Sequence, residues 1–484
     1  MRREAVQFRR ALVLVMGTLV VPGSAQLLAG NRRVGGWALA AWVSLAVTVG
    51  LTAWLVPLDT LLRLAVRPSV LTTFQVLVFG VVVGWGALLL DAWRLGRPPS
   101  LARRHRVVVA VLTLGLCAAL AYPAVTAVRY AAAARDAVVA LFPSGRAAAT
   151  SGGRVNVLLL GADAGEGRVG LRPDSIHLVS VDARTARPVM FSLPRNLERA
   201  RFPEDTPAGE VFPRGFTGEG DEEDFLLNAT WTYGEDNPDL FPGPAGPGAT
   251  AVKQAVEGTL GLPVHYYVLV DLAGFQSLVD ALGGVTLTIP ERIPIGQQGR
   301  VLEPGERRLD GYETLWFARS REGSSDYARM ARQRCVVDAV LREADPATVL
   351  RNFTELAATA TSLLETDVPQ AQVGELLDLA LRAKSQELTS VQFVPPLVSP
   401  ADPDVDLIRE TVRDAVSASV RPAAGTASGR AQAEATQDDA VAGLGDADPG
   451  AGTASRSASP AAPAAAAVRQ EASPVTSDVT SACG

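Results

Sequence analysis

The most restrictive feature of this sequence is a set of four apolar stretches near its start, at about 11–30, 35–56, 70–92 and 107–130. A helix needs about 20 apolar residues to cross the ~30 Å hydrocarbon core of a membrane, and the last three stretches satisfy this. The first is weaker, because Pro22-Gly23-Ser24 interrupts it and Gln26 follows. It is not a signal peptide in front of a soluble protein, since three more apolar stretches follow it. Residues 1–130 are therefore predicted to form a transmembrane module.

Arginine placement predicts how this module is inserted, because cytoplasmic loops carry an excess of Lys and Arg. Arg clusters precede the first stretch, follow it directly, and separate the third from the fourth: Arg2, Arg3, Arg9, Arg10, Arg32, Arg33, Arg94, Arg97, Arg103, Arg104 and Arg106. If all four stretches crossed, the last cluster would lie outside and the rest of the chain inside. If segment 11–30 is re-entrant or interfacial, all clusters face the cytoplasm and only Arg63 and Arg67 lie outside. We therefore expect three spans in the cell membrane, with everything after residue 130 on the extracellular face.

Composition supports a membrane component joined to a globular part, with 48 % apolar and 20 % charged residues. A net charge of -6 gives no indication of nucleic-acid binding. The three cysteines, Cys117, Cys335 and Cys483, form no CxxC motif or Cys/His cluster. Neither a structural zinc site nor a disulfide framework is therefore expected.

The middle of the chain has the pattern of an α/β domain. Residues 131–153 are Ala-rich and predict a helical stalk and linker. Between 154 and 398, expected strands and helices alternate: strands at 155–161, 176–181, 188–193, 266–270 and 285–289, helices at 249–260 and 272–282, and helical periodicity from 312 to about 383. This alternation favours a layered α/β domain around a central sheet.

Two further segments are expected to lie outside the packed core. Acidic residues among Gly and Pro at 199–225 predict a solvated loop insertion. From 399 to 484 the chain is rich in Ala, Gly, Ser, Pro, Asp and Thr with almost no aromatic residues. Such a composition cannot bury enough apolar surface to offset ordering, so the tail is predicted to be disordered.

Charged residues follow the expected strands. Asp163 comes directly after the first strand, and Arg172 and Asp174 precede the second. Two carboxylates at a strand end can share Mg²⁺, which prefers one or two carboxylates and keeps other positions for water and phosphate oxygens. The alternative is a turn Asp and a capping Asp without a metal.

Arginine residues recur at three further places: Arg195 after the third strand, the pair Arg319 and Arg321, and the pair Arg329 and Arg332 on one helix face. The guanidinium group suits a diphosphate because its planar fork donates two parallel hydrogen bonds and keeps its charge. The alternative is a basic helix face that is solvated or paired with the acidic insertion.

Other kinds of site lack support in this sequence. His105, His177 and His265 are isolated from one another, and His177, in the middle of an expected strand, is predicted to pack in the core. There is no GxSxG, HExxH, P-loop or GxGxxG in a strand–helix context, which argues against a serine hydrolase, zinc protease, NTPase or dinucleotide enzyme.

The charged groups lie within a series of motifs that occur in a fixed order: NVLLLGAD (156–163), RPDS (172–175), SLPRN (192–196), LNATWTYG (227–234), HYYVLVDLAGFQSLVDALGGV (265–285), LDGYETLWFARSR (309–321) and ARMARQR (328–334). Over about residues 154–345 the chain resembles the LytR–CpsA–Psr (LCP) family of cell-wall glycopolymer ligases. The broken segment VPGSAQLLAG (21–30) is similar to actinobacterial members. The resemblance implies an α/β/α sandwich that holds a polyprenyl diphosphate lipid in an apolar groove.

The resemblance also implies roles for individual residues. Asp163 and Asp174 would ligate Mg²⁺, Arg172, Arg195, Arg319 and Arg321 would clamp the diphosphate, and Asn228, Arg329, Arg332 and Gln333 would complete the pocket. The chain departs from the family at Asn196, where Asp is usual, and at Arg334, where Gln is common. An amide cannot act as a base at neutral pH, so the residue that accepts the proton is left open.

The reaction implied by the resemblance is phosphoryl transfer. A peptidoglycan hydroxyl, the muramic acid 6-hydroxyl in this family, would attack the sugar-side phosphorus of a polyprenyl-diphosphate-linked glycopolymer. Polyprenyl phosphate would leave, and a phosphodiester would join polymer and wall. Two alternatives stay open: a polyprenyl diphosphate hydrolase that uses water, and a non-catalytic lipid-binding or regulatory membrane protein, which Asn196 favours.

Overall fold

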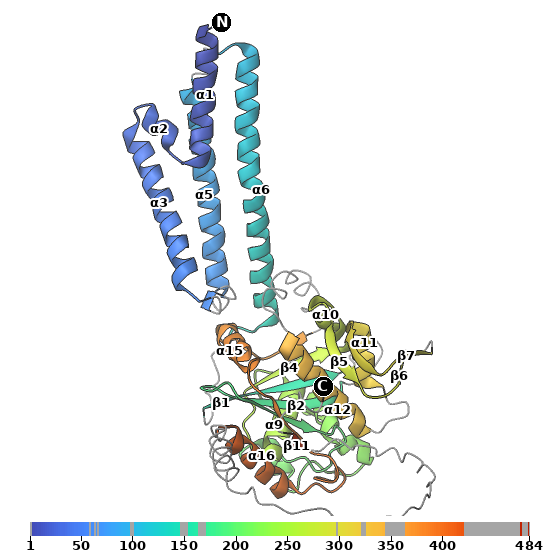
Figure 1. The fold of residues 1–484 in the computed structure, drawn as a ribbon. Helices are drawn as coiled ribbons and strands as arrows, with labels where there is room; N and C mark the ends of the chain where they lie inside the picture. Colours follow the sequence, from blue (N-terminus) through green and yellow to red (C-terminus); the bar gives the residue numbers. More distant parts are fainter. Residues whose placement is uncertain are drawn as a thin grey trace, which may run out of the picture.

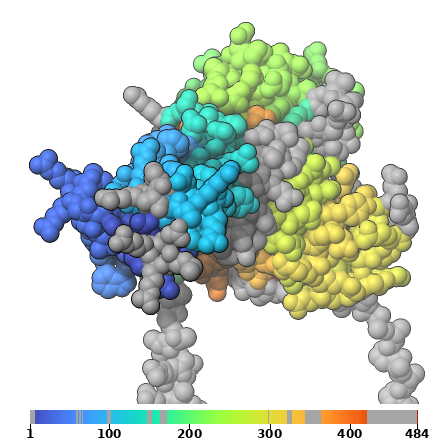
Figure 2. All heavy atoms as spheres, turned by 90° about the horizontal axis from the view of Figure 1, so that it is seen from above, coloured from blue at the N-terminus to red at the C-terminus, as the bar shows by residue number. Residues whose placement is uncertain are grey.

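The chain folds into an N-terminal bundle of helices and a compact α/β domain joined by one long helix (Figure 1). The computed structural model describes residues 2–57, 60–61, 64, 67–96, 101–145, 153–162, 171–296, 299–320, 326–343, 364–420, 475–476 and 483. Seen from above, the blue and cyan helices lie over one side of the domain, and the yellow part of the chain around residue 300 projects beside them (Figure 2). The two parts are therefore offset from each other.

Three helices of the bundle are long and apolar enough to cross a membrane: α3 (Arg32–Leu55), α5 (Pro68–Leu95) and α6 (Arg103–Leu141). They coincide with the last three apolar stretches of the sequence. The first stretch instead forms α1 (Arg2–Val20) and the short α2 (Ser24–Leu28), which turns back beside α1 (Figure 1). That segment 11–30 is re-entrant or interfacial stays a prediction.

The break between α1 and α2 is built by glycine and held by buried polar contacts. Gly23 has φ +89°, and a Cβ atom there would lie 2.6 Å from the carbonyl oxygen of Gly35, so only glycine fits. Gln26 is fully buried and donates from Nε2 to Leu88 O at 3.1 Å and to Asp91 Oδ2 at 3.0 Å. The residue that weakened the first apolar stretch therefore fixes the hairpin against α5.

Helix α6 passes without interruption from the bundle to the domain. It continues to Leu141, so the first part of the expected stalk is helical. Gln370 of the domain is hydrogen-bonded to the residues that follow α6: the Gln370 N–H donates to Pro143 O at 3.0 Å, and Nε2 donates to Phe142 O at 2.9 Å. This contact fixes the domain directly at the end of the bundle.

The domain is organised around a mixed seven-stranded sheet with the order β11-β10-β3-β2-β1-β4-β9. Its strands are β1 (Arg154–Ala162), β2 (Pro173–Asp182), β3 (Pro188–Leu193), β4 (Tyr266–Asp271), β9 (Leu364–Thr366), β10 (Thr389–Gln392) and β11 (Val475–Thr476). Strands β1, β2 and β3 form an antiparallel meander, and β4 pairs parallel with β1. The expected strand at 285–289 forms as β5 (Val285–Ile289), but it pairs with β8 (Gly305–Leu309) outside this sheet.

Helices cover both faces of the sheet and give an α/β/α sandwich. Because successive side chains on a strand point to opposite faces, Leu158 and Leu160 of β1 enter the main core, while Leu159 faces the other side. The main core lies under α8 (Thr230–Asp236), α9 (Pro247–Leu260) and α16 (Val405–Val420), and the opposite face carries α10 (Leu272–Ala281), α11 (Gly311–Arg319), α12 (Asp326–Glu343) and α15 (Gln370–Ala383). Shorter elements complete the domain: α7 (Pro207–Val211), η2 (Glu222–Phe225), η3 (Leu227–Ala229), η4 (Pro238–Leu240), β6 (Ile293–Ile295) and β7 (Arg300–Leu302).

The domain continues past residue 398, so the prediction that disorder begins at 399 is wrong. Ile408 and Val412 of α16 are fully buried in the main core, one helical turn apart. Because small and polar residues predominate over 399–484 as a whole, the composition averaged over this range conceals the buried residues of α16. Residues 421–474 lie outside the described part, and their disorder stays a prediction.

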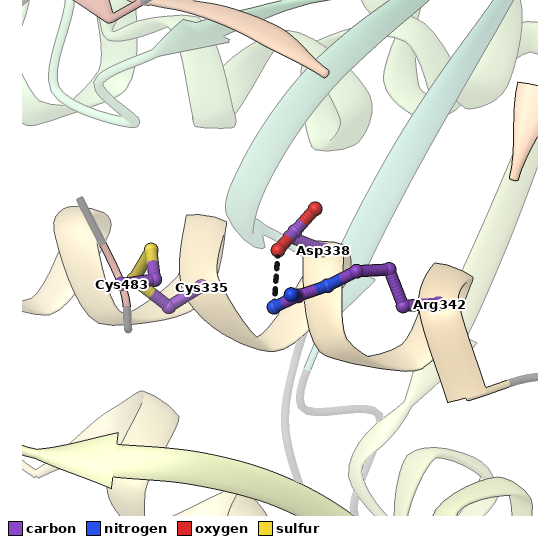
Figure 3. Close-up of a disulfide and its surroundings, with 4 residues drawn as sticks. All are labelled: Cys335, Asp338, Arg342 and Cys483. Atoms are coloured by element: carbon purple, nitrogen blue, oxygen red, sulfur yellow. Dashed lines mark ion pairs between the residues drawn. A yellow bond between two sulfur atoms is a disulfide. The ribbon is translucent and has the colours of Figure 1, made fainter. Parts of the chain in front are cut away.

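A disulfide also contradicts the expectation from the cysteine pattern. Cys335 on α12 is bonded to Cys483, 148 residues later, with 5.5 Å between the two Cα atoms (Figure 3). One turn further along α12, Asp338 and Arg342 form an ion pair at 2.7 Å. No motif spacing indicates a pair so far apart in sequence, because only the fold brings the C-terminal segment to α12.

Candidate phosphate and lipid site

A cavity of about 1170 Å³ lies between the sheet and the helices α10, α11 and α12. Its polar wall contains seven of the ten predicted site residues: Arg172, Asp174, Arg195, Asn228, Arg319, Arg329 and Gln333. Its apolar wall comes from both layers and includes Leu159, Val268, Val270, Phe275, Leu278, Val337 and Leu341. One continuous cavity therefore joins a cationic region to a hydrocarbon surface.

Strand pairing brings Asp174 and Arg195 together at the polar end. Asp174 lies at the start of β2 and Arg195 just after the end of β3, and the antiparallel pairing of Ile176 with Leu193 puts these positions side by side. Arg195 Nη1 donates to Asp174 Oδ1 at 2.6 Å, with side chains 31 % and 40 % exposed. This half-exposed pair is open to a ligand that competes for the guanidinium.

The acidic insertion lies at the rim of the cavity rather than in open solvent. Arg172 donates to Glu223 O and to Asp224 Oδ1, both at 3.2 Å, and Glu223 contributes to the cavity lining. Glu222, Glu223 and Asp224 are exposed, as predicted for a solvated insertion, and the 3-10 helix η2 that carries them lies at the rim of the cavity. The sequence alternative paired the acidic insertion with the basic helix face, whereas the arginine paired with it in the structure is Arg172.

Helix α12 supplies a buried guanidinium to the same place. Arg329 is only 3 % exposed and donates from Nη1 to the backbone oxygen of Asp174 at 3.3 Å. Arg319, at the exposed end of α11, lies over the Trp316 ring at 5.3 Å from its centroid. Arg319 and Arg329 thus reach one cavity from two different helices.

Arg332 is placed differently from the prediction. Its side chain is buried and donates to Phe317 O at 2.8 Å and to Ser320 O, and it is absent from the cavity lining. These carbonyls belong to the last turn of α11 and the residue after it. Arg332 therefore satisfies backbone oxygens that the helix end leaves unpaired, and it holds α11 against α12.

Two amide residues of the cavity wall, Asn228 and Gln333, have buried side-chain oxygens. Asn228 is 7 % exposed, and within the described part of the chain its Oδ1 atom has no hydrogen-bond partner. Its backbone N–H donates to Arg195 O at 3.0 Å, which fixes it beside that arginine. Gln333 Oε1 is likewise buried without a partner among the described residues. An unsatisfied buried acceptor costs about 1–3 kcal/mol, so a ligand that donates hydrogen bonds would relieve a cost here.

His177 is buried, as predicted, and it also lies on the cavity wall. It is 4 % exposed, and Nδ1 is 2.8 Å from Ser192 Oγ on the neighbouring strand. Burial, and then the positive charge of Arg329, lower the pKa of the imidazole to about 4, so it is neutral at physiological pH. Sequence inspection missed it because an isolated histidine in a strand carries no motif.

Of the two predicted Mg²⁺ ligands, the described residues include Asp174. Asp174 contributes one carboxylate, and its second oxygen can still bind a cation. Within the described residues, no group of three or more His, Cys, Asp or Glu side chains could hold a metal by itself. A Mg²⁺ ion that takes one or two carboxylates and completes its shell with phosphate oxygens and water agrees with this arrangement. Asp163 and Arg321 lie outside the described residues, and Asn196 lines the cavity without supplying a carboxylate.

Comparison with known proteins decides the family. The LytR_cpsA_psr family model matches residues 125–397, more than half of the chain. The chain belongs to the LytR_cpsA_psr family. The seven motifs quoted between residues 156 and 334 lie within the matched range, and the cavity is formed largely by them.

Curated relatives of this LytR_cpsA_psr protein include two enzymes named polyisoprenyl-teichoic acid–peptidoglycan teichoic acid transferase TagU. The protein from Oceanobacillus iheyensis is 31 % identical over 225 residues, 46 % of this chain and 62 % of the relative. The protein from Enterococcus faecalis is 27 % identical over 217 residues, 44 % of this chain and 61 % of the relative. The chain thus spans about three-fifths of the length of these relatives.

Solved structures with a similar chain course include Bacillus subtilis TagV, at 22 % identity and a TM-score of 0.39, covering 55 % of this chain and 99 % of that one. Another is described as TagT bound to LIIa-WTA, at 21 % identity and a TM-score of 0.41, covering 56 % and 94 %.

Proposed function

We propose that this protein is a membrane-anchored phosphotransferase that attaches a polyprenyl-diphosphate-linked glycopolymer to peptidoglycan. The observation that carries the proposal is the single cavity with arginines at one end and a hydrocarbon wall at the other. A lipid diphosphate has the same two parts, an anionic head and an apolar chain. The names of the curated relatives support the same substrate class.

The cavity's position favours a donor supplied by the membrane. Phe275 and Leu278 of its apolar wall belong to α10, which lies at the end of the domain next to the helical bundle (Figure 1). An isoprenoid chain could pass from the bilayer to this wall while the diphosphate moves on to Arg195 and Arg329. The unbroken helix α6 supports a fixed distance between the bilayer and the cavity.

The chemistry follows from the charges that surround the diphosphate. An acceptor hydroxyl attacks the sugar-side phosphorus, the bond to the polyprenyl phosphate breaks, and the hydroxyl proton passes to water. Phosphoryl transfer spreads negative charge over the phosphate oxygens, and fixed guanidinium groups lower its energy. Arg195 and Arg329, both anchored on Asp174, are positioned for this, and Arg172 and Arg319 approach from the rim.

Asn228 is suited to orient the acceptor. Its buried Oδ1 atom has no partner among the described residues, and it lies beside Arg195. A hydroxyl that donates to this oxygen would be held close to the phosphorus. An amide does not take up the proton, so Asn228 positions the hydroxyl but is no base.

Asp174, together with Asp163, would hold Mg²⁺ against the diphosphate. The ion would supply a Lewis acid for the phosphate oxygens and a template for their placement. The carboxylate of Asp174 already binds Arg195, so in this arrangement a single side chain aligns the cation and the guanidinium.

We further propose that α3, α5 and α6 span the cell membrane and that the domain lies outside. The Arg clusters in the first half of α1, at the start of α3 and around the connection from α5 to α6 support this orientation. A membrane-impermeant maleimide applied to intact cells should label an Arg292→Cys variant, whose parent side chain is 69 % exposed, and should not label Arg103→Cys. The reverse pattern would place the domain in the cytoplasm and end the proposal.

The activity is tested with purified full-length protein, a lipid-diphosphate glycan, peptidoglycan and Mg²⁺. Glycan joined to peptidoglycan through a phosphodiester is the expected product. Arg329→Ala should reduce its formation strongly, while Arg292→Ala, which removes an exposed ion pair with Glu303, should have no effect. Free phosphate-ended glycan would identify a hydrolase instead, and binding without any turnover would identify a non-catalytic lipid-binding protein.

A further inference from the structure

His177 lies where the cavity changes from polar to apolar. Along β2, Ser175 precedes it on the same face, and Ser175 and Asp174, at the start of the strand, both belong to the polar end of the cavity. Strand geometry places His177 about 7 Å beyond Ser175, because each residue advances the chain by about 3.3 Å. The next residue on this face, Val179, packs against the apolar cluster of Met190 and Leu388, as do Val337 and Leu341 of the cavity wall.

A hydrogen bond to the neighbouring strand fixes the orientation of the His177 ring. Its cross-strand neighbour on β3 is Ser192, which is fully buried, and the two side chains are hydrogen-bonded through Nδ1 and Oγ at 2.8 Å. Ser192 is absent from the cavity lining, whereas His177 is part of it. When Ser192 donates its hydroxyl hydrogen to Nδ1, the ring hydrogen of the neutral imidazole is on Nε2. The remaining ring edge can then donate into the cavity.

A nearby charge makes this position attractive for an anion. Arg329, itself buried, is close enough to lower the pKa of His177, in second place after burial. A guanidinium and an N–H donor that share a wall at the start of the hydrocarbon surface suit a phosphate oxygen. The phosphate that reaches this boundary is the one to which the isoprenoid is attached, since its chain must continue along the apolar wall.

We propose that His177 binds the phosphate attached to the isoprenoid chain, and so holds the group that leaves as polyprenyl phosphate. The proposal rests on the function proposed above and adds a substrate-binding residue to it. The alternative is that the hydrogen bond between His177 and Ser192 only satisfies two buried polar side chains. The two hypotheses differ in one respect: only the first makes the binding of a lipid monophosphate depend on the imidazole.

Calorimetric titration of the full-length protein in detergent with geranyl monophosphate and geranyl diphosphate separates the two phosphates. His177→Leu should weaken both ligands by about 10-fold or more, the loss expected for a hydrogen bond to a charged group. His177→Gln retains a donor and should recover part of the loss. Equal binding by wild type and His177→Leu overturns the proposal, and so does a loss confined to the diphosphate.

Ser192→Ala and His265→Gln serve as matched controls. Ser192→Ala keeps the imidazole and frees the ring, so it should weaken both ligands less than His177→Leu. His265 is also hydrogen-bonded through Nδ1, which accepts the Asn156 N–H at 3.0 Å, and it lies outside this cavity. Its replacement should leave both affinities unchanged.

A second measurement applies if His177→Leu does not fold. The ¹⁵N signals of the His177 ring in the wild-type protein should shift on addition of geranyl monophosphate, and those of His265 should not. Unshifted His177 signals at saturation overturn the proposal. Wild-type protein that binds neither ligand contradicts the function proposed above as well, whereas wild-type binding that is insensitive to His177→Leu contradicts this inference alone.

Discussion

The two faces of the central sheet are built by the same strands but packed very differently. On one face, Leu158 and Phe191 are fully buried beneath α9 and α16 in a solid core. On the other, their strand neighbours Leu159 and Ser192 lie beside or beneath a cavity of about 1170 Å³. The two faces of the sheet therefore serve different purposes. The filled core on one face stabilises the domain, and the other face leaves space for a ligand.

The largest expected effect of this asymmetry lies in β1. Leu158→Ala empties a closed core and should lower the free energy of unfolding by about 2–5 kcal/mol. Leu159→Ala, one residue further along β1, enlarges a cavity that is already open. It should lower the free energy of unfolding clearly less than Leu158→Ala does. Thermal or urea unfolding of both variants measures the difference, and equal losses would contradict the claim that the second face is hollow.

Removal of charge from the cavity face should affect transfer rather than folding. Arg195→Ala takes away a half-exposed guanidinium directed at the diphosphate, and transfer should fall by about 10²–10³-fold, as for other fixed groups that stabilise transition-state charge. The unfolding midpoint should change little, because the lost ion pair with Asp174 is partly solvated. Arg199→Ala, which removes an exposed pair with Asp402, is the matched control and should retain full transfer.

Acid should weaken the cavity face through His177. Its pKa is lowered from 6.5 to about 4 in the folded protein, so the unfolded chain binds more protons between these values. Stability from this group is present above pH 6.5 and is lost as the pH falls towards 4, by up to about 3 kcal/mol. Urea unfolding at pH 7, 5.5 and 4.5 should therefore show a smaller decrease for His177→Gln than for wild type. Parallel curves would exclude a neutral buried imidazole.

The smallest effect is expected at the rim, where Asp224 holds Arg172 at 3.2 Å. Both side chains are about half exposed, so the pair contributes little to stability. Asp224→Asn leaves Arg172 free to turn to a phosphate and should tighten geranyl diphosphate binding by about 2- to 5-fold, a change of less than 1 kcal/mol. Weaker binding in this variant would indicate that the acidic rim orients Arg172 for the ligand instead.

Sequence patterns predicted the parts of the fold that repeat locally. Strands β1, β2, β3 and β4 were each expected near their observed positions, because continuous apolar runs of strand length identify buried strands. Charged residues at the strand ends were expected to converge, and Asp174 and Arg195 do so through the β2–β3 pairing.

Features that depend on distant contacts were missed. Helix α16 has apolar residues at helical spacing, but the composition averaged over residues 399–484 conceals this short segment, which packs on a core formed by β3 and α9. The Cys335–Cys483 bond requires the C-terminal segment to return to α12. Arg332 was assigned to the ligand because it shares a helix face with Arg329, but the carbonyls at the end of α11 attract it. In each of these three cases, a contact with a residue far away in the sequence determines what the segment or side chain does, and the local sequence pattern does not show that contact.

The central claim is that one cavity holds both the head and the chain of a lipid diphosphate. Photo-crosslinking tests it most directly: a polyprenyl diphosphate analogue with a diazirine in the isoprenoid is irradiated with the full-length protein, and the labelled peptides are sequenced. Labels should fall on Val268, Phe275 and Leu278, and excess geranyl diphosphate should remove them. Labels confined to the helical bundle, or insensitive to the competitor, would contradict the account.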